Sequence, residues 1–221
     1  MVATANAVIN RWHSPLKRLL RFLLGCFLRI EVEGRSLVPA VGPLVVYFNH
    51  SNWIDPLVAA AVVDREVTVL AKAELFRVPL VGQLLRAYGV FPIRREEGDL
   101  RAMKTALSVL NRGSVLVAAP EGTRSSDGVL QRGKPGIVHM AARTGAHLQP
   151  VAIVGVVGYT ENLKRFRKTP VQVTFGAPYH IGRSSSRPSR DDGQALVDDA
   201  MVRLAALMPP ELRGVYGDAG R

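Results

Sequence analysis

Short apolar runs alternate with segments of helical periodicity along most of this chain. The short runs, which suit buried strands, lie at residues 43–49, 67–70, 90–93, 115–118, 151–157 and 171–175. The segments with apolar positions at helical spacing lie at residues 55–63, 79–88, 99–110, 135–143 and 194–208. Alternation of this kind is the pattern of an α/β domain. We therefore expect one α/β domain, with a largely parallel mixed sheet flanked by helices.

The first thirty residues form a separate segment that is basic and carries no carboxylate. From Leu16 onward its apolar residues recur at helical spacing, and we expect Ser14 to cap this helix and Pro15 to occupy its first position. The stripe consists of Leu16, Leu19, Leu20, Leu23, Leu24, Phe27 and Leu28. A basic helix with such a stripe suits an anionic membrane surface, with the leucines at the acyl boundary and Lys and Arg near lipid phosphates. The alternative is that the stripe packs on the domain.

We accordingly divide the chain into residues 1–30, amphipathic helices of a membrane interface, and residues 31–221, the α/β domain. The composition adds positive charge to this picture. The 221 residues include 29 Lys and Arg against 18 Asp and Glu, a formal net charge of +11, which favours an acidic partner such as nucleic acid, an anionic membrane or a phosphorylated substrate.

The sequence also bears on location. The single cysteine, Cys26, excludes an intramolecular disulfide and fits a reducing compartment. No uncharged apolar run reaches the length that a membrane span needs, and the N-terminus does not have the pattern of a cleaved signal peptide. We expect a peripheral or monotopic protein on the cytoplasmic face of the membrane.

One histidine has a carboxylate close by in the sequence. Residues 49–56 read NHSNWIDP, which places His50 at the end of a predicted strand and Asp55 at the start of a predicted helix. If Asp55 caps that helix, its carboxylate can accept the proton of one imidazole nitrogen and leave the other nitrogen basic. His50 would then be a general base oriented by Asp55. The spacing alone arises often by chance, and helix capping would by itself account for Asp55.

A second polar segment follows the strand expected at residues 115–118. Residues 120–125 read PEGTRS, in which Gly122 permits close backbone approach, Thr123 supplies a hydroxyl and Arg124 supplies a planar fork of donors suited to phosphate. Ligands of parallel sheets bind beyond the carboxyl ends of the strands, so this loop is well placed to hold a phosphorylated or hydroxylated group. An ordinary surface turn is the alternative.

A third strand end carries two arginines, in the sequence GVFPIRR at residues 89–95. Taken in order, NHSNWIDP, GVFPIRR, PEGTRS and LQPVAI at residues 148–153 resemble the glycerolipid acyltransferase family, and within it the 1-acylglycerol-3-phosphate acyltransferases. The resemblance covers roughly residues 34 to 180, and the ordered set is far more specific than any one motif.

The resemblance implies roles for individual residues. His50 matches the family's catalytic base and Asp55 matches its partner. Arg95 matches an arginine that binds the acceptor phosphate, and Lys72 resembles a lysine often found before it. The residues that we expect to bind substrate are Lys72, Arg95, Glu121, Gly122, Thr123 and Arg124.

The resemblance also implies the reaction. A fatty acyl group would pass from an acyl thioester, acyl-CoA or acyl carrier protein, to the free hydroxyl of 1-acylglycerol-3-phosphate, forming phosphatidic acid. The chain has no G-x-S-x-G nucleophile elbow, so we expect direct transfer without an acyl-enzyme, and neither a metal nor a cofactor besides the donor. Ala119 and Pro92 depart from the family pattern and leave the acceptor open, so another lysophospholipid or a lyso-aminolipid is an alternative.

Two alternatives come from other classes of protein. A basic domain could bind nucleic acid, or an inactive relative could bind a membrane surface without catalysis. Aromatic residues make up only 6% of the chain and no nucleic-acid-binding motif is evident, so we expect no nucleic acid partner. The presence of His50, Asp55 and Glu121 together argues against an inactive site.

Overall fold

The computed structural model describes residues 13–93, 100–183 and 189–217, and in them a single seven-stranded sheet. The strands are β1 (Leu28–Glu33), β2 (Leu44–Phe48), β3 (Val67–Lys72), β4 (Val90–Ile93), β5 (Val115–Ala118), β6 (His147–Val154) and β7 (Thr169–Phe175). Their order across the sheet is β1-β7-β6-β2-β5-β3-β4. Neighbouring strands are parallel except β6 and β7, which are antiparallel. The prediction of an α/β domain with a largely parallel mixed sheet is confirmed.

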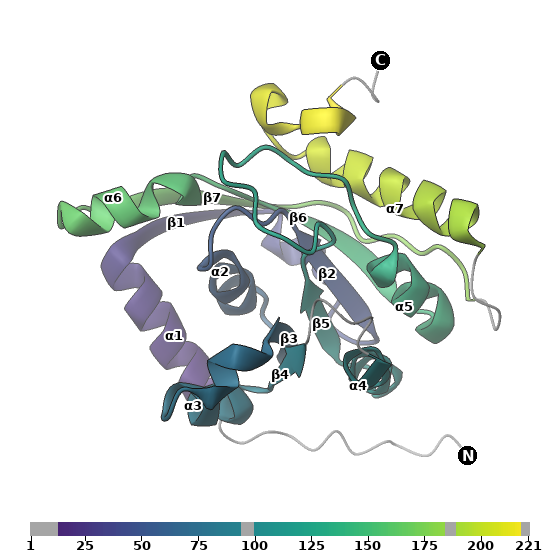
Figure 1. The fold of residues 1–221 in the computed structure, drawn as a ribbon, viewed down its shortest axis with the longest axis horizontal. Helices are drawn as coiled ribbons and strands as arrows, with labels where there is room; N and C mark the ends of the chain where they lie inside the picture. The colour runs from purple at the N-terminus through teal and green to yellow at the C-terminus, as the bar shows by residue number, and fades with distance from the viewer. Residues whose placement is uncertain (1–12, 94–99, 184–188, 218–221) are drawn as a thin grey trace.

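Helices cover both faces of the sheet (Figure 1). On one face lie α1 (His13–Phe27), α2 (Asp55–Val62) and α3 (Val81–Tyr88), and on the other lie α4 (Leu100–Asn111), α5 (Gly136–Thr144) and α7 (Arg190–Ala205). The short helix α6 (Tyr159–Lys164) precedes β7. Single 3-10 turns are formed at Arg35–Leu37, Ala73–Arg77, Val156–Gly158, Pro210–Leu212 and Gly214–Tyr216.

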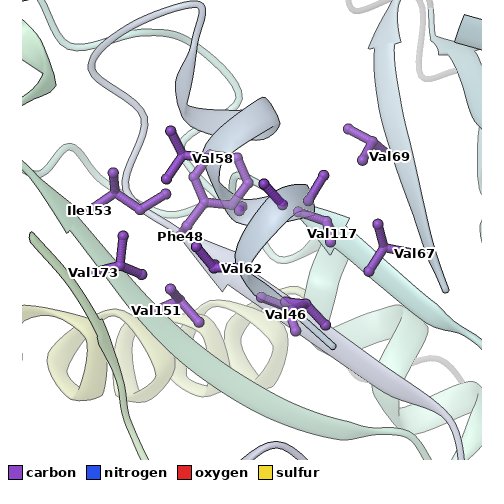
Figure 2. Close-up of a cluster of buried hydrophobic side chains, with 14 of the residues drawn as sticks. Val46, Phe48, Val58, Val62, Val67, Val69, Val117, Val151, Ile153 and Val173 are labelled. Atoms are coloured by element: carbon purple, nitrogen blue, oxygen red, sulfur yellow. The ribbon is translucent and has the colours of Figure 1, made fainter. Parts of the chain in front are cut away.

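The central strand β2 is apolar at every position because both of its faces are covered. Val46 and Phe48 point toward α2, where they join Val117 and Ile153 in the cluster shown in Figure 2. Val45 belongs to the cluster on the opposite face, beneath α5 and α7. The sheet is therefore held between two apolar layers, and its strand ends are fixed in position.

Residues 13–30 of the N-terminal segment pack on the domain. The division expected at residue 30 falls inside β1, which pairs with β7 along its whole length from Leu28 to Glu33. This strand was not predicted, although Ile30 and Val32 follow Leu28 at the alternating spacing of a strand, because Leu28 was assigned to the helical stripe that precedes it. Within the described residues, no helix has both the length and the apolar character needed to cross a membrane.

Several predicted boundaries are wrong. Helix α1 already includes His13, so Ser14 lies inside it and is not its cap. Ile54, not Asp55, is the N-cap of α2, and Asp55 is the first helical residue. Strand β6 begins at His147 and α7 at Arg190, each four residues before the predicted start, because polar residues at an element's end carry no apolar signal.

Candidate active site

The polar loops that follow β2 and β5 meet at one edge of the sheet. The two strands are parallel neighbours, with Tyr47 opposite Ala118, so their carboxyl ends lie side by side. The loops are also bonded to each other, because the Ser125 N–H donates to the His50 carbonyl oxygen at 2.7 Å. The structure therefore brings together two sequence motifs that are 71 positions apart.

His50 and Asp55 form a buried pair. Nδ1 of His50 lies 3.2 Å from Oδ2 of Asp55, and the two side chains are 5% and 0% exposed. The ring of Phe48 contacts the imidazole edge-on, with centroids 5.9 Å apart. With the proton on Nδ1 donated to the carboxylate, Nε2 carries the lone pair and can act as a base. Within the described residues no hydrogen bond is made to Nε2.

Asp55 also shapes the loop that carries His50. Its Oδ2 atom accepts hydrogen bonds from the backbone N–H groups of Ser51 at 2.6 Å and Asn52 at 2.7 Å. The other oxygen, Oδ1, is buried and has no hydrogen-bond partner among the described residues. Asp55 therefore does not cap its own helix; its carboxylate reaches back and folds residues 50–55 around itself.

Glu121 holds His50 from the other loop. Its Oε1 accepts from the His50 N–H at 2.7 Å and its Oε2 accepts from the Gln131 N–H at 2.9 Å. The side chain is almost fully buried, and this burial raises the pKa of Glu121 to about 7, against the lowering effect of the two backbone donors. Both oxygens accept from backbone donors, so the Glu121 carboxylate holds the backbone of His50; the substrate binding that the sequence predicts for Glu121 stays a prediction.

The rest of the PEGTRS loop is more open. Gly122 has φ +72°, a conformation that a side chain disfavours, and a Cβ added there would come within 3.0 Å of Lys134 Nζ. The Thr123 hydroxyl donates to Gln131 Oε1 at 3.1 Å. Arg124 is exposed, so its guanidinium group is accessible to a ligand at this edge.

Of the other two cations predicted to bind substrate, Lys72 and Arg95, the structure describes only Lys72. Lys72 is exposed at the carboxyl end of β3, next to β5 in the sheet. This position is at the same edge of the sheet as His50. Arg95 lies outside the described residues. Within the described residues, no group of three or more His, Cys, Asp and Glu side chains is arranged to hold a metal ion.

Sequence reasoning missed two residues that build the site. Asn49 exchanges two hydrogen bonds with the backbone of Ile153, at 2.8 and 2.9 Å, and so fixes the chain directly before His50 to β6. An amide side chain that ends an apolar strand is a signal that could have identified it. Gln131 has no such signal, since only the folded loop brings its N–H to Glu121.

Comparison with known proteins agrees with this architecture. The family model described as Acyltransferase matches residues 29–154, which include β1 to β6 and both loops of the site. The chain belongs to this family. It is an acyltransferase that resembles the 1-acylglycerol-3-phosphate acyltransferases, as the sequence motifs predicted.

Curated relatives share between about a quarter and just over a third of the aligned residues with this chain. The 1-acyl-sn-glycerol-3-phosphate acyltransferase of Bacillus subtilis is 27% identical over 180 residues, which cover 80% of this chain and 87% of that protein. The lyso-ornithine lipid O-acyltransferase of Pseudomonas aeruginosa is 36% identical over 146 residues, 63% of this chain and 55% of that protein. The chain spans 37% of a chloroplast acyltransferase of Arabidopsis thaliana.

A solved structure shares the fold. The 1-acyl-sn-glycerophosphate acyltransferase of Thermotoga maritima superimposes with a TM-score of 0.69, over 88% of this chain and 77% of that one, at 24% identity. This chain therefore has the α/β fold of that solved structure.

Proposed function

We propose that this acyltransferase moves a fatty acyl group from an acyl thioester to the free hydroxyl of 1-acylglycerol-3-phosphate, forming phosphatidic acid. The observation that carries the proposal is the buried pair of His50 and Asp55 beside a loop that bears an accessible arginine. The names of the relatives supply the substrate class, since most of those compared are 1-acylglycerol-3-phosphate acyltransferases.

In the proposed reaction His50 is the general base. Nε2 takes the proton of the acceptor hydroxyl as its oxygen attacks the thioester carbonyl carbon. Asp55, on Nδ1, keeps the imidazole in the required tautomer and stabilises the imidazolium ion that forms. The tetrahedral intermediate then expels the thiolate, which takes the proton from the imidazolium. Attack and departure occur in one site without an acyl-enzyme, and the donor thioester is the only co-substrate that the proposal invokes.

The phosphate of the acceptor needs cations at this edge of the sheet. Arg124 and Lys72 are exposed there and are proposed to bind it, together with Arg95. Thr123 and Gly122 line the same loop, where the glycine leaves room for a ligand to approach the backbone.

The oxyanion of the tetrahedral intermediate needs a donor from elsewhere. The backbone N–H groups of His50, Ser51 and Asn52 already donate to the carboxylates of Glu121 and Asp55. These three amides follow one another in the catalytic loop and would otherwise be the natural candidates. The stabilising donor is therefore none of these three backbone amides.

We also propose that α1 binds an anionic membrane surface, in an orientation that differs from the one the sequence predicted. Lys17 and Arg21 turn toward the domain, where they donate to carbonyl oxygens at the end of α2. Leu24 and Leu28 are also buried. The exposed apolar residues of this helix are Leu19, Phe22, Leu23 and Phe27. One face of the helix thus packs against the domain, and an exposed apolar face is left that can contact lipid.

A lyso-aminolipid is a second candidate acceptor, because a lyso-ornithine lipid O-acyltransferase is 36% identical to this chain over their matched region. The two candidates differ in the headgroup that the exposed cations would meet. A phosphate monoester suits Arg124 and Lys72, whereas an ornithine headgroup carries a cation of its own.

The test measures thiol release from acyl-CoA by the purified protein, with each acceptor in turn. We expect release that depends on 1-acylglycerol-3-phosphate and is abolished in His50→Ala. His147→Ala, at the amino end of β6, changes another histidine at the opposite edge of the sheet and should retain activity. Full activity of a folded His50→Ala protein contradicts the mechanism, and release with only the lyso-ornithine acceptor contradicts the proposed substrate.

A further inference from the structure

The turn between α6 and β7 presents an aromatic side chain entirely to solvent. Residues 164–168 read KRFRK, and Phe166 at the centre is 100% exposed. Its backbone has φ +54°, a region that non-glycine residues seldom occupy. A large apolar ring held out in a disfavoured backbone conformation contributes nothing to the core, and such outliers point to a function.

The turn is held by backbone bonds and is not a loose loop. The N–H of Phe166 donates to the Leu163 carbonyl at 3.1 Å, and the N–H of Arg167 donates to the Asn162 carbonyl at 2.9 Å. The Asn162 side chain also donates to the Thr169 hydroxyl at 3.2 Å, which closes the turn onto the start of β7. The backbone that carries Phe166 is therefore held in place.

Four cationic residues flank Phe166 in the sequence. Lys164, Arg165, Arg167 and Lys168 are all exposed. Two carboxylates lie nearby. Glu161 pairs with Lys164 at 2.8 Å. The exposed Glu31 is opposite Gln172 of β7, three residues beyond Thr169, where the turn ends. The turn therefore combines an exposed apolar ring with an excess of positive charge.

The turn also adjoins the apolar face of α1. Nζ of Lys168 donates to the Gly25 carbonyl at 2.6 Å, near the end of that helix. Phe22 and Phe27, which flank Gly25 in sequence, are 69% and 44% exposed. Figure 1 shows α6 and the junction of α1 with β1 at the same side of the molecule.

This side of the molecule is also linked to the catalytic loop. The ring of Trp53, three residues after His50 and 54% exposed, packs edge-on against Tyr159, the first residue of α6, with centroids 5.9 Å apart. A partner that bound at the end of α6 would therefore lie near the loop that carries the proposed base.

We propose that residues 164–168 are a second point of membrane insertion, where the Phe166 ring enters the boundary of an anionic bilayer while the flanking cations bind lipid phosphates. The proposal rests on the membrane association proposed for α1 and extends it to a separate element. An exposed ring between cations has the composition that interfacial anchors require. Its continuity with the apolar face of α1 favours a bilayer over an acidic protein, for which the cations alone would suffice.

The test measures binding of the full chain to vesicles of phosphatidylcholine mixed with phosphatidylglycerol, by co-sedimentation. Phe166→Asn removes the ring but keeps a residue that tolerates positive φ. We expect it to bind about tenfold more weakly than the wild type, the effect of burying a large apolar side chain. The matched control is Val215→Asn, which removes another apolar side chain, 73% exposed, from the segment after α7 and should bind normally.

A second pair of variants tests the cations. Arg165→Glu/Arg167→Glu should weaken binding by more than about 25-fold, at about fivefold for each cation lost, and only on vesicles that contain phosphatidylglycerol. Arg112→Glu/Arg143→Glu makes the same change in net charge in the turn after α4 and in α5, and should have a much smaller effect.

The outcomes separate this proposal from the proposed function. Wild-type binding by Phe166→Asn, or an equal loss in Val215→Asn, overturns the insertion point. A second result also overturns the insertion point: the turn variants bind vesicles normally, but they use acyl carrier protein as donor less well than they use acyl-CoA. The turn would then bind an acidic protein. Acyl transfer assayed in detergent micelles should be the same in all variants; its absence from the wild type would contradict the proposed function and leave the vesicle result unaffected.

Discussion

The backbone N–H of His50 donates a 2.7 Å hydrogen bond to Oε1 of Glu121, while the carbonyl oxygen of His50 accepts one of 2.7 Å from the Ser125 N–H. Both backbone groups of the proposed base are thus bonded to the PEGTRS loop. Since Asp55 fixes the imidazole ring, the side chain and the backbone of His50 are held by different parts of the chain. A base constrained in this way needs little reorganisation before reaction.

Replacement of Glu121 tests its positioning role. In Glu121→Gln an amide N–H group faces one of the two backbone donors, so His50 or Gln131 loses its acceptor. Above pH 7, where the Glu121 carboxyl is ionised, we expect kcat to fall about tenfold or more. The free energy of unfolding should fall by no more than about 2 kcal/mol, because removal of a buried charge offsets the lost bond.

The matched control for this variant is Glu161→Gln. Glu161 pairs with Lys164 at the surface, where such pairs contribute about 1 kcal/mol or less. If kcat and the unfolding free energy change by the same small amounts in both variants, Glu121 has no positioning role.

Asp55→Asn separates the charge of the carboxylate from the folding of its loop. An amide oxygen in the place of Oδ2 can still accept from Ser51, Asn52 and Nδ1 of His50, but it carries no negative charge to stabilise the imidazolium ion that forms in the reaction. We expect a loss of about 10²- to 10⁴-fold in kcat with little change in KM. Steady-state kinetics with a thermal unfolding control measures this, and a variant as active as the wild type would show that Asp55 serves only the loop.

Gly122 is expected to resist substitution because of its backbone. Gly122→Ala places a side chain at φ +72° and brings its Cβ against Lys134, so we expect a loss of about 1–2 kcal/mol in the free energy of unfolding. Gly136→Ala is the control, because it lies in the first turn of α5 with nothing within 4 Å of an added Cβ. Denaturant titration of both should show destabilisation in the first only; equal stabilities would mean that the turn at Gly122 relaxes freely.

The attachment of α1 to the domain should depend on pH through His13. Its Nε2 accepts from the Val67 N–H, and burial, with the nearby Lys17, lowers the pKa of His13 to about 4. Below the ordinary pKa of 6.5 the unfolded chain binds a proton that the folded chain excludes, so stability is lost as pH falls from 6.5 to about 4. The loss is up to about 3 kcal/mol from this group.

The comparison is with His13→Gln, which keeps an acceptor and does not titrate. Denaturant unfolding at pH values above and below this range should give a smaller loss of stability in the variant than in the wild type. Parallel pH profiles for the two proteins would show that His13 is not the group responsible.

The apolar face of α1 is tested by substitution and not by truncation. Removal of residues 1–30 would take half of β1 with it and unfold an edge of the sheet. Leu19→Asn/Leu23→Asn removes two exposed leucines instead, and we expect at least tenfold weaker binding to anionic vesicles. Val41→Asn/Leu100→Asn removes two apolar residues elsewhere that are more exposed than these leucines, and should bind as the wild type does; equal losses in the two variants contradict a specific role for α1.

The site was only partly predictable from the sequence. The NHSNWIDP motif identified His50 and Asp55, because residues five apart across a strand end and a helix start can meet through local geometry alone. No local feature reveals that the Glu121 carboxylate turns inward to the amides at positions 50 and 131, and the substrate binding predicted for Glu121 stays a prediction. The same limit applied to α1, where the sequence shows an apolar stripe but not which side the domain covers.

The sequence by itself determined the fold class and the two motifs, since periodicity and turn chemistry are local properties that neighbouring residues impose on one another. Only the tertiary structure decided which polar groups serve the backbone and which remain accessible. A carboxylate buried between two loops accepts hydrogen bonds from the N–H groups that folding brings next to it, and those groups belong to segments distant in the sequence. That is why the Glu121 carboxylate bonds to the backbone of the proposed base, and why Lys17 and Arg21 donate to carbonyl groups of the domain while four apolar side chains of the same helix are exposed.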